Sequence, residues 1–242
     1  MGVGFHTDAN EVGACSSPMW KPATTFETGA CIDTGQSSRH QQDALMKDLV
    51  AWLIRVVCGV RTLPAEALPP APVIYFANHS SHLDFLTIWA ALPAAARARV
   101  RPVAGRDYWE KTERRRRIAR DLFNAVLIER QHVTVATNPL APMLAALEAG
   151  DSLIVFPEGT RSADGAIHEF KSGLYHLARG RPGIPLVPVY LQNLSRILPK
   201  GDYLPVPLLG SLALGAPLTL GAGEGKADFL QRARAAVQQL AS

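Results

Sequence analysis

Two hydrophobic patterns alternate along the chain from about residue 73 onward. Short continuous apolar runs, typical of buried strands, occur at residues 73–77, 100–104, 125–128, 152–156 and 185–190. Stretches with helical spacing of apolar residues lie between or after them, at 85–92, 114–124, 139–149, 170–179 and 227–240. Strands alternating with helices predict an α/β fold: a single domain with a mainly parallel central sheet flanked by helices. Sites in such folds lie at the carboxyl ends of the strands.

The N-terminal part of the chain shows a different pattern. Residues 1–40 are rich in Gly, Thr, Ser and Ala without a regular period, which predicts a loosely ordered extension before a domain at 41–242. Residues 43–58 have apolar positions at helical spacing and predict an amphipathic helix. Its apolar face packs either on the domain or in a lipid interface, and periodicity alone does not distinguish the two.

Composition narrows the class of protein. The 242 residues are 48% hydrophobic and 19% charged, with a formal net charge of +4, which fits one globular domain with an anionic partner. The three cysteines are scattered and fit neither a disulfide framework nor a zinc motif, so we expect free thiols in a reducing compartment. No run of 18 apolar residues and no signal peptide is present. We therefore expect a peripheral protein on the cytoplasmic face of a membrane.

The most basic segment of the chain includes Arg114, Arg115, Arg116 and Arg117. Such a run is either a solvated helix face or a contact for anionic headgroups of a membrane surface. Nucleic acid is not expected as a partner, because the sequence lacks a reader motif and interleaved exposed aromatics.

A histidine and an aspartate follow the first predicted strand, in the segment Asn78–Phe85. Across a tight turn the Asp84 carboxylate can reach the imidazole of His79, orient the ring and stabilise its protonated form. This arrangement makes a general base. On spacing alone, chance or a structural hydrogen bond explains the pattern better than a catalytic pair does. A metal site with His82 lacks further ligands at a familiar spacing, so no metal is expected.

A second polar cluster, Phe156–Arg161, follows the strand predicted at 152–156. Backbone amides near Gly159, the Thr160 hydroxyl and the Arg161 guanidinium can together hold a phosphate. The alternative is an ordinary turn with a surface arginine. Two such clusters at the ends of buried strands in one small domain favour a site.

These two clusters resemble the signature blocks of the glycerolipid acyltransferases, the family that includes 1-acylglycerol-3-phosphate acyltransferases. Further segments resemble other blocks of that family in the same order: Leu127–Arg130, Phe170–Gly173 and Ile184–Val189. The resemblance covers roughly residues 44–225. One departure is Asn124, which stands where the block ending at Arg130 usually opens with glycine.

The resemblance implies roles for individual residues. His79 would be the catalytic base and Asp84 would orient it. The glycerol-phosphate end of the acceptor would be held by Arg130, Glu158, Gly159, Thr160 and Arg161, with Lys171 assisting. The apolar walls of the strands and of the first helix would hold the acyl chain.

The resemblance also implies a reaction. The donor would be acyl-CoA or acyl carrier protein, with no other cofactor. The acceptor would be a lysophospholipid, foremost 1-acylglycerol 3-phosphate, which gives phosphatidic acid. Glycerol 3-phosphate, another lysophospholipid or a lyso-aminolipid are alternative acceptors. An inactive basic membrane-binding protein is the alternative from another class. The oligomeric state stays open.

Overall fold

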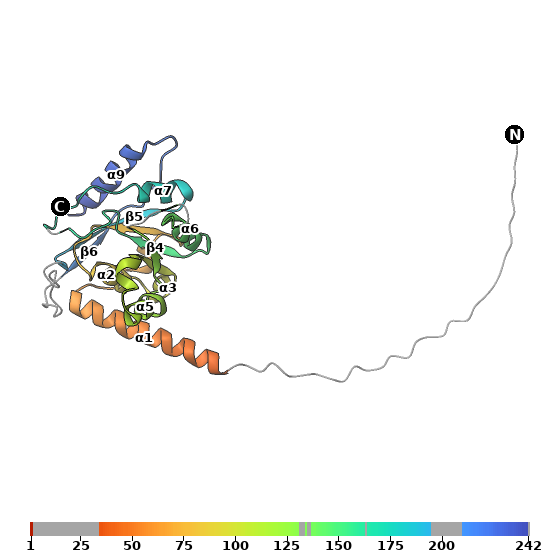
Figure 1. Cartoon of the computed structure of the whole chain (residues 1–242), viewed down its shortest axis with the longest axis vertical. Helices are drawn as coiled ribbons and strands as arrows, with labels where there is room; N and C mark the ends of the chain where they lie inside the picture. Colours follow the sequence, from red (N-terminus) through yellow and green to blue (C-terminus); the bar gives the residue numbers. More distant parts are fainter. Residues whose placement is uncertain (2–33, 131–133, 135–136, 163, 195–209, 242) are drawn as a thin grey trace.

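The computed structural model describes residue 1 and residues 34–130, 134, 137–162, 164–194 and 210–241 (Figure 1). Its centre is a six-stranded sheet in the order β3-β2-β4-β1-β5-β6. The strands are β1 (Ile74–Ala77), β2 (Val100–Gly105), β3 (Val126–Ile128), β4 (Ser152–Val155), β5 (Leu186–Gln192) and β6 (Ser211–Leu214). Only β6, at one edge, is antiparallel to its neighbour. The predicted α/β fold with a mainly parallel sheet is therefore confirmed.

Helices cover both faces of this sheet (Figure 1). They are α1 (Thr34–Cys58), α2 (Asp84–Ala91), α3 (Ala94–Ala98), α4 (Arg106–Trp109), α5 (Glu113–Arg117), α6 (Leu140–Glu148), α7 (Gly173–Gly180) and α9 (Lys226–Gln239), with a 3₁₀ turn at Ala65–Ala67. Successive residues of β1 enter different cores, because side chains of a strand alternate between its faces. Ile74 and Phe76 pack with α6, α7 and α9, whereas Tyr75 and Ala77 pack with α1 and α2.

Most predicted elements are present, with shifted ends. The basic helix expected at 114–124 is α5 followed by a π-helical turn, Ile118–Leu122. It stops before Asn124, whose φ of 48° lies in the left-handed region. Asparagine tolerates this conformation better than most residues, so Asn124 can replace glycine here. The helix expected from Phe170 begins only at Gly173, and Phe170 packs edge-on against Phe76 in the core.

Helix α1 starts at Thr34, inside the range expected to be loosely ordered, and the rest of that prediction, residues 2–33, lies outside the described residues. One side of α1 packs on the domain through Ala51 and Cys58, which are fully buried. Polar contacts also fasten it: Arg97 pairs with Asp48, and Nη1 of Arg55 donates to the carbonyl of Ala90 at 3.0 Å.

The other side of α1 is apolar and uncovered. Six large side chains are 47% to 64% exposed: Leu45, Met46, Leu49, Trp52, Leu53 and Val56. The predicted packing of α1 on the domain is therefore confirmed for one stripe. Contact of the second, exposed stripe with lipid stays a prediction. Among the described residues, no helix combines the length and the hydropathy needed to cross a bilayer.

Candidate active site

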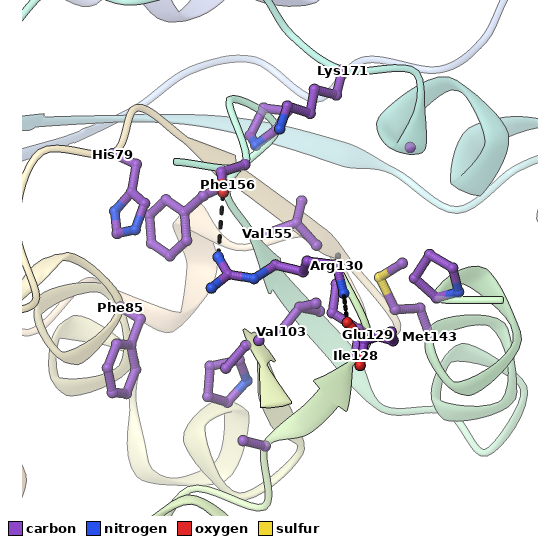
Figure 2. Close-up of a pocket in the computed structure, with 18 of the residues that line it drawn as sticks. His79, Phe85, Val103, Ile128, Glu129, Arg130, Met143, Val155, Phe156 and Lys171 are labelled. Atoms are coloured by element: carbon purple, nitrogen blue, oxygen red, sulfur yellow. Dashed lines mark hydrogen bonds between the residues drawn. The ribbon is translucent and has the colours of Figure 1, made fainter. Parts of the chain in front are cut away.

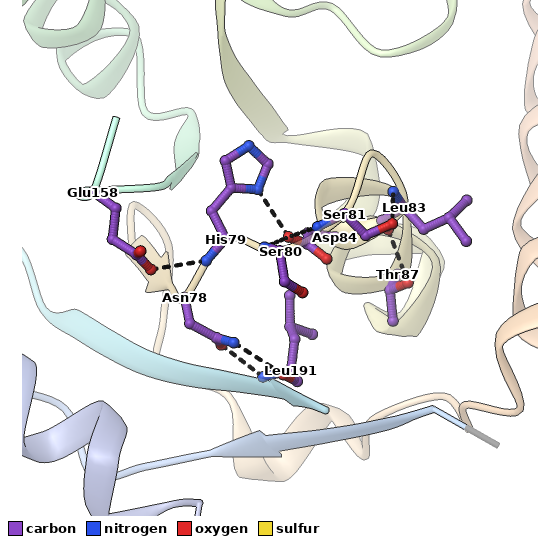
Figure 3. Close-up of polar contacts among 9 residues, drawn as sticks. All are labelled: Asn78, His79, Ser80, Ser81, Leu83, Asp84, Thr87, Glu158 and Leu191. Atoms are coloured by element: carbon purple, nitrogen blue, oxygen red, sulfur yellow. Dashed lines mark hydrogen bonds and ion pairs between the residues drawn. The ribbon is translucent and has the colours of Figure 1, made fainter. Parts of the chain in front are cut away.

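His79 and Asp84 form a hydrogen-bonded dyad just beyond the end of β1 (Figure 3). Nδ1 of His79 lies 2.8 Å from Oδ2 of Asp84, whose side chain is fully buried. Nε2 makes no hydrogen bond within the described part of the chain. The His79 ring stacks on Phe156 with centroids 4.2 Å apart. The ring is thus held from one edge and one face, and Nε2 is left for a substrate.

Backbone donors hold the Asp84 carboxylate in place. Oδ2 also accepts the N–H groups of Ser80 at 2.6 Å and Ser81 at 2.8 Å. Asp84 is the first residue of α2, where the helix dipole favours a negative charge. These contacts fix the Asp84 carboxylate at the Nδ1 edge of the His79 ring, so the orientation of the ring is set.

The two polar clusters are joined through backbone groups (Figure 3). Oε1 of Glu158 accepts the His79 N–H at 3.0 Å, and Oε2 accepts the N–H of His168 at 3.3 Å. The carbonyl of His79 accepts the N–H of Ser162 at 2.7 Å. Burial raises the pKa of Glu158, and the two backbone donors partly offset that effect. Glu158 therefore fixes the position of His79 relative to the second cluster.

Asn78 anchors the start of the first cluster to the neighbouring strand. Its side-chain oxygen accepts the N–H of Leu191 at 2.8 Å, and its amide donates to the Leu191 carbonyl at 2.9 Å. The backbone N–H and carbonyl of Leu191 in β5 thereby form hydrogen bonds just beyond the end of β1. The sequence block contained Asn78, but its role was not predicted because its partners belong to a strand remote in sequence.

A cavity of about 1000 Å³ opens beside the dyad (Figure 2). His79, Phe85 and Phe156 form part of its wall, and its apolar wall is built largely from β2, β3, α6 and α7, including Val103, Met143 and Leu177. Helix α1 contributes no residue to this wall, so the expectation that it holds the acyl chain is wrong for this cavity.

Most of the predicted acceptor-binding residues line this cavity. They are Arg130, Gly159, Thr160, Arg161 and Lys171. Gly159 has a φ of 73°, and an added Cβ there would lie 2.7 Å from Nζ of Lys171, so glycine is required for this close approach. In Figure 2 the Arg130 side chain extends across the cavity toward His79. Three cationic side chains therefore line the same cavity as His79.

Glu158 does not belong to that group. It is 4% exposed, is absent from the cavity wall, and has both carboxylate oxygens turned to backbone N–H groups. A carboxylate would also repel a phosphate. These contacts favour a positioning role for Glu158. The acceptor-binding role implied by the resemblance stays a prediction.

The stacking of His82, Tyr108 and Arg115 near the cavity was not predicted from the sequence. His82 stacks on Tyr108 with centroids 5.2 Å apart, and the Arg115 guanidinium lies 4.4 Å above the Tyr108 ring. Burial lowers the pKa of His82, and the nearby Arg161 and His79 act in the same direction. The lowered pKa favours the neutral form of His82 beside His79. Among the described residues, no group of three or more His, Cys, Asp or Glu side chains is arranged to hold a metal.

Comparison with known proteins places this site in a family. Residues 60–192 match the model of the acyltransferase family. The chain is 29% identical over 149 residues to the chloroplastic 1-acyl-sn-glycerol-3-phosphate acyltransferase BAT2 of Brassica napus, covering 60% of this chain and 39% of that protein. It is 30% identical over 160 residues to 1-acyl-sn-glycerol-3-phosphate acyltransferase alpha of Homo sapiens, covering 64% and 54%. The chain thus spans about two fifths to one half of these relatives.

A solved structure shares the fold. The 1-acyl-sn-glycerophosphate acyltransferase PlsC from Thermotoga maritima superposes with a TM-score of 0.67 at 20% identity, covering 87% of this chain and 83% of that one. The matched family region contains both polar clusters and the strands that carry them. The chain therefore belongs to the acyltransferase family, as the glycerolipid acyltransferase blocks in its sequence predicted.

Proposed function

We propose that this protein transfers an acyl group from a thioester donor to the free hydroxyl of 1-acylglycerol 3-phosphate, giving phosphatidic acid. The observation that carries the proposal is the His79–Asp84 dyad facing a cavity that also holds Arg130, Arg161 and Lys171. A general base beside clustered cations suits an acceptor that combines a hydroxyl with a phosphate.

The mechanism needs no enzyme nucleophile. Nε2 of His79 takes the proton of the acceptor hydroxyl, and the oxygen attacks the thioester carbonyl. The carbon–sulfur bond of the resulting tetrahedral intermediate then breaks, and the imidazolium returns its proton to the leaving thiolate. Asp84, 2.8 Å from Nδ1, stabilises the imidazolium between these two steps. Acyl-CoA and acyl carrier protein supply the same thioester, so either donor satisfies this chemistry, and the proposal includes no other cofactor.

We also propose that the protein works at an anionic membrane surface. The uncovered stripe of α1 has the size and polarity of an interfacial contact, and Ile118, next to the basic α5, is 45% exposed. Figure 1 places α5 on the same side of the domain as α1. Apolar side chains beside arginines complement acyl chains beneath anionic headgroups. That this surface is the cytoplasmic one stays a prediction from the cysteine pattern.

The experiment that tests the reaction is a panel of acceptors with radiolabelled acyl-CoA and acyl carrier protein. The panel contains 1-acylglycerol 3-phosphate, glycerol 3-phosphate, lysophosphatidylethanolamine and a lyso-aminolipid. We expect labelled phosphatidic acid with the first acceptor and much slower turnover with the others. Preferred labelling of another acceptor would keep the chemistry and replace the acceptor. No product with any acceptor would favour the inactive membrane-binding alternative.

A histidine variant provides the matched control for this panel. His79→Ala removes the proposed base. His168→Ala removes a side chain that is 54% exposed and pairs with Asp164, while its backbone N–H to Glu158 is retained. Only the first substitution is expected to abolish labelling.

A further inference from the structure

Arg130 is held by a carboxylate that the proposed reaction does not use. Its Nε and Nη2 donate to Oδ1 of Asp107 at 3.1 and 2.8 Å, and Nη2 also donates to Oδ2 at 2.8 Å. Nη1 makes one longer bond, 3.3 Å, to the carbonyl of Gly159. Asp107 therefore grips one side of the guanidinium, the edge formed by Nε and Nη2.

The register of the sheet brings these two residues together. Gly105 at the end of β2 pairs with Ile128 at the end of β3. Asp107 and Arg130 each lie two positions further along, beyond the carboxyl ends of adjacent parallel strands. Gly105 provides the space for them, because an added Cβ would clash with Nε of Arg130 and Oδ1 of Asp107. The contact is thus built into the backbone of two strands.

The contact with Asp107 leaves Nη1 of Arg130 able to bind a phosphate. A guanidinium can bind an anion through the Nε–Nη2 edge or through the end formed by Nη1 and Nη2. Asp107 takes the first and also engages Nη2 of the second. Nη1 makes only the long bond to Gly159 and is therefore the nitrogen most available to a phosphate. The long, flexible arginine side chain loses rotamer freedom when it binds, and that cost is reduced when the side chain is already held.

Considered by its charge alone, Asp107 is expected to weaken the binding of an anionic ligand. Among the described residues of the cavity wall, Arg130, Arg161 and Lys171 are opposed by Asp107 and Glu129. Removing the Asp107 charge would make the cavity more positive and would favour an anionic ligand. The two effects of Asp107 therefore have opposite signs, and an experiment distinguishes them.

We propose that Asp107 is a positioning residue that presents Nη1 of Arg130 to the phosphate of the acceptor. The proposal rests on the proposed function, because it takes a phosphate-bearing acceptor as the ligand. It gives Asp107 a part in selecting acceptors with a phosphate over acceptors without one.

The test measures binding of 1-oleoylglycerol 3-phosphate without an acyl donor, by calorimetry, and then acyl transfer with a donor. Asp107→Asn is expected to weaken binding about three- to tenfold, as for loss of a partly exposed ion pair. The KM for this acceptor should rise similarly and kcat should stay within about twofold. Gly105→Ala, which displaces both side chains, should act in the same direction. The preference for 1-oleoylglycerol 3-phosphate over 1-oleoylglycerol should fall.

Glu224→Gln is the matched control. Arg232 donates from Nε at 2.8 Å and from Nη2 at 2.7 Å to the Glu224 carboxylate, a similar pair outside the cavity wall. Its loss should leave acceptor binding unchanged.

The outcomes separate this inference from the proposed function. Unchanged or tighter binding by Asp107→Asn, with Arg130→Gln still weaker than the unmodified protein, would overturn the positioning role and leave the proposed acceptor intact. Absence of binding by the unmodified protein would rule out the phosphate-bearing acceptor and, with it, the positioning role of Asp107. Weaker binding by Asp107→Asn with an unchanged thermal midpoint of unfolding would support it.

Discussion

The backbone N–H of His79 donates to Oε1 of Glu158 at 3.0 Å, joining two positions 79 residues apart. This bond ties the loop after β1 to the loop after β4. His79, the proposed base, is therefore positioned by its main chain as well as by the Asp84 carboxylate at Nδ1.

Glu158→Gln tests that relationship. The amide oxygen can replace one carboxylate oxygen, but the amide nitrogen would then face the second backbone N–H. We expect kcat to fall roughly 10- to 100-fold through misplacement of His79, with the acceptor KM within about twofold. Steady-state kinetics with 1-acylglycerol 3-phosphate provide the measurement. A large rise in KM at constant kcat would instead return Glu158 to acceptor binding.

Arg161→Gln should act in the opposite way. Arg161 lines the cavity and is placed to meet the phosphate, so its loss removes charge-assisted hydrogen bonds. The expected result is an acceptor KM raised about 10- to 100-fold with a smaller effect on kcat. Arg232→Gln, outside the cavity wall, serves as the control. An unchanged KM for Arg161→Gln would place the phosphate elsewhere.

Vesicle flotation tests the surface formed by α1 and α5. Replacing Leu49, Trp52 and Leu53 by serine should weaken binding to neutral and anionic vesicles alike, by about 1 kcal/mol for each half-exposed side chain. Replacing Arg114, Arg116 and Arg117 by glutamine should weaken binding to anionic vesicles only. Full binding by the serine variant would show that the exposed stripe of α1 contacts something other than lipid.

His82 predicts a dependence of stability on pH. Burial lowers its pKa below the ordinary 6.5, so the unfolded state binds more protons as the pH falls toward and below that value. The stability that neutral His82 contributes to the fold is fully present above pH 6.5. It is lost as the pH drops through the folded-state pKa of His82. The thermal midpoint of His82→Gln should therefore fall less between pH 8 and pH 5 than that of the unmodified protein. Parallel falls would assign the acid sensitivity to other groups.

Local patterns predicted the strands and both polar clusters, because a buried strand and the loop that follows it are encoded by adjacent residues. Contacts between residues on neighbouring strands were harder to predict from the sequence. Asp107 has no signal of its own, and its pairing with Arg130 depends on the register of β2 with β3. The resemblance placed Glu158 with the acceptor-binding residues, and its hydrogen bonds to two backbone N–H groups could not be predicted from the sequence.

The edge strand and the first helix illustrate the same limit. β6 is short, and three of its four residues are only half-buried, so it lacks the continuous apolar run of the central strands. The spacing in α1 predicted an amphipathic helix. It could not separate the stripe that packs through Ala51 and Cys58 from the stripe that stays exposed, because both are apolar.

The central claim is that Nε2 of His79 is the base that activates the acceptor hydroxyl. The most direct measurement is the rate of phosphatidic acid formation by His79→Ala, with folding checked by circular dichroism and acceptor binding by calorimetry. The account predicts an intact fold, near-normal binding of 1-acylglycerol 3-phosphate and loss of at least about 10²-fold in kcat. A folded His79→Ala variant with near-normal turnover would contradict it.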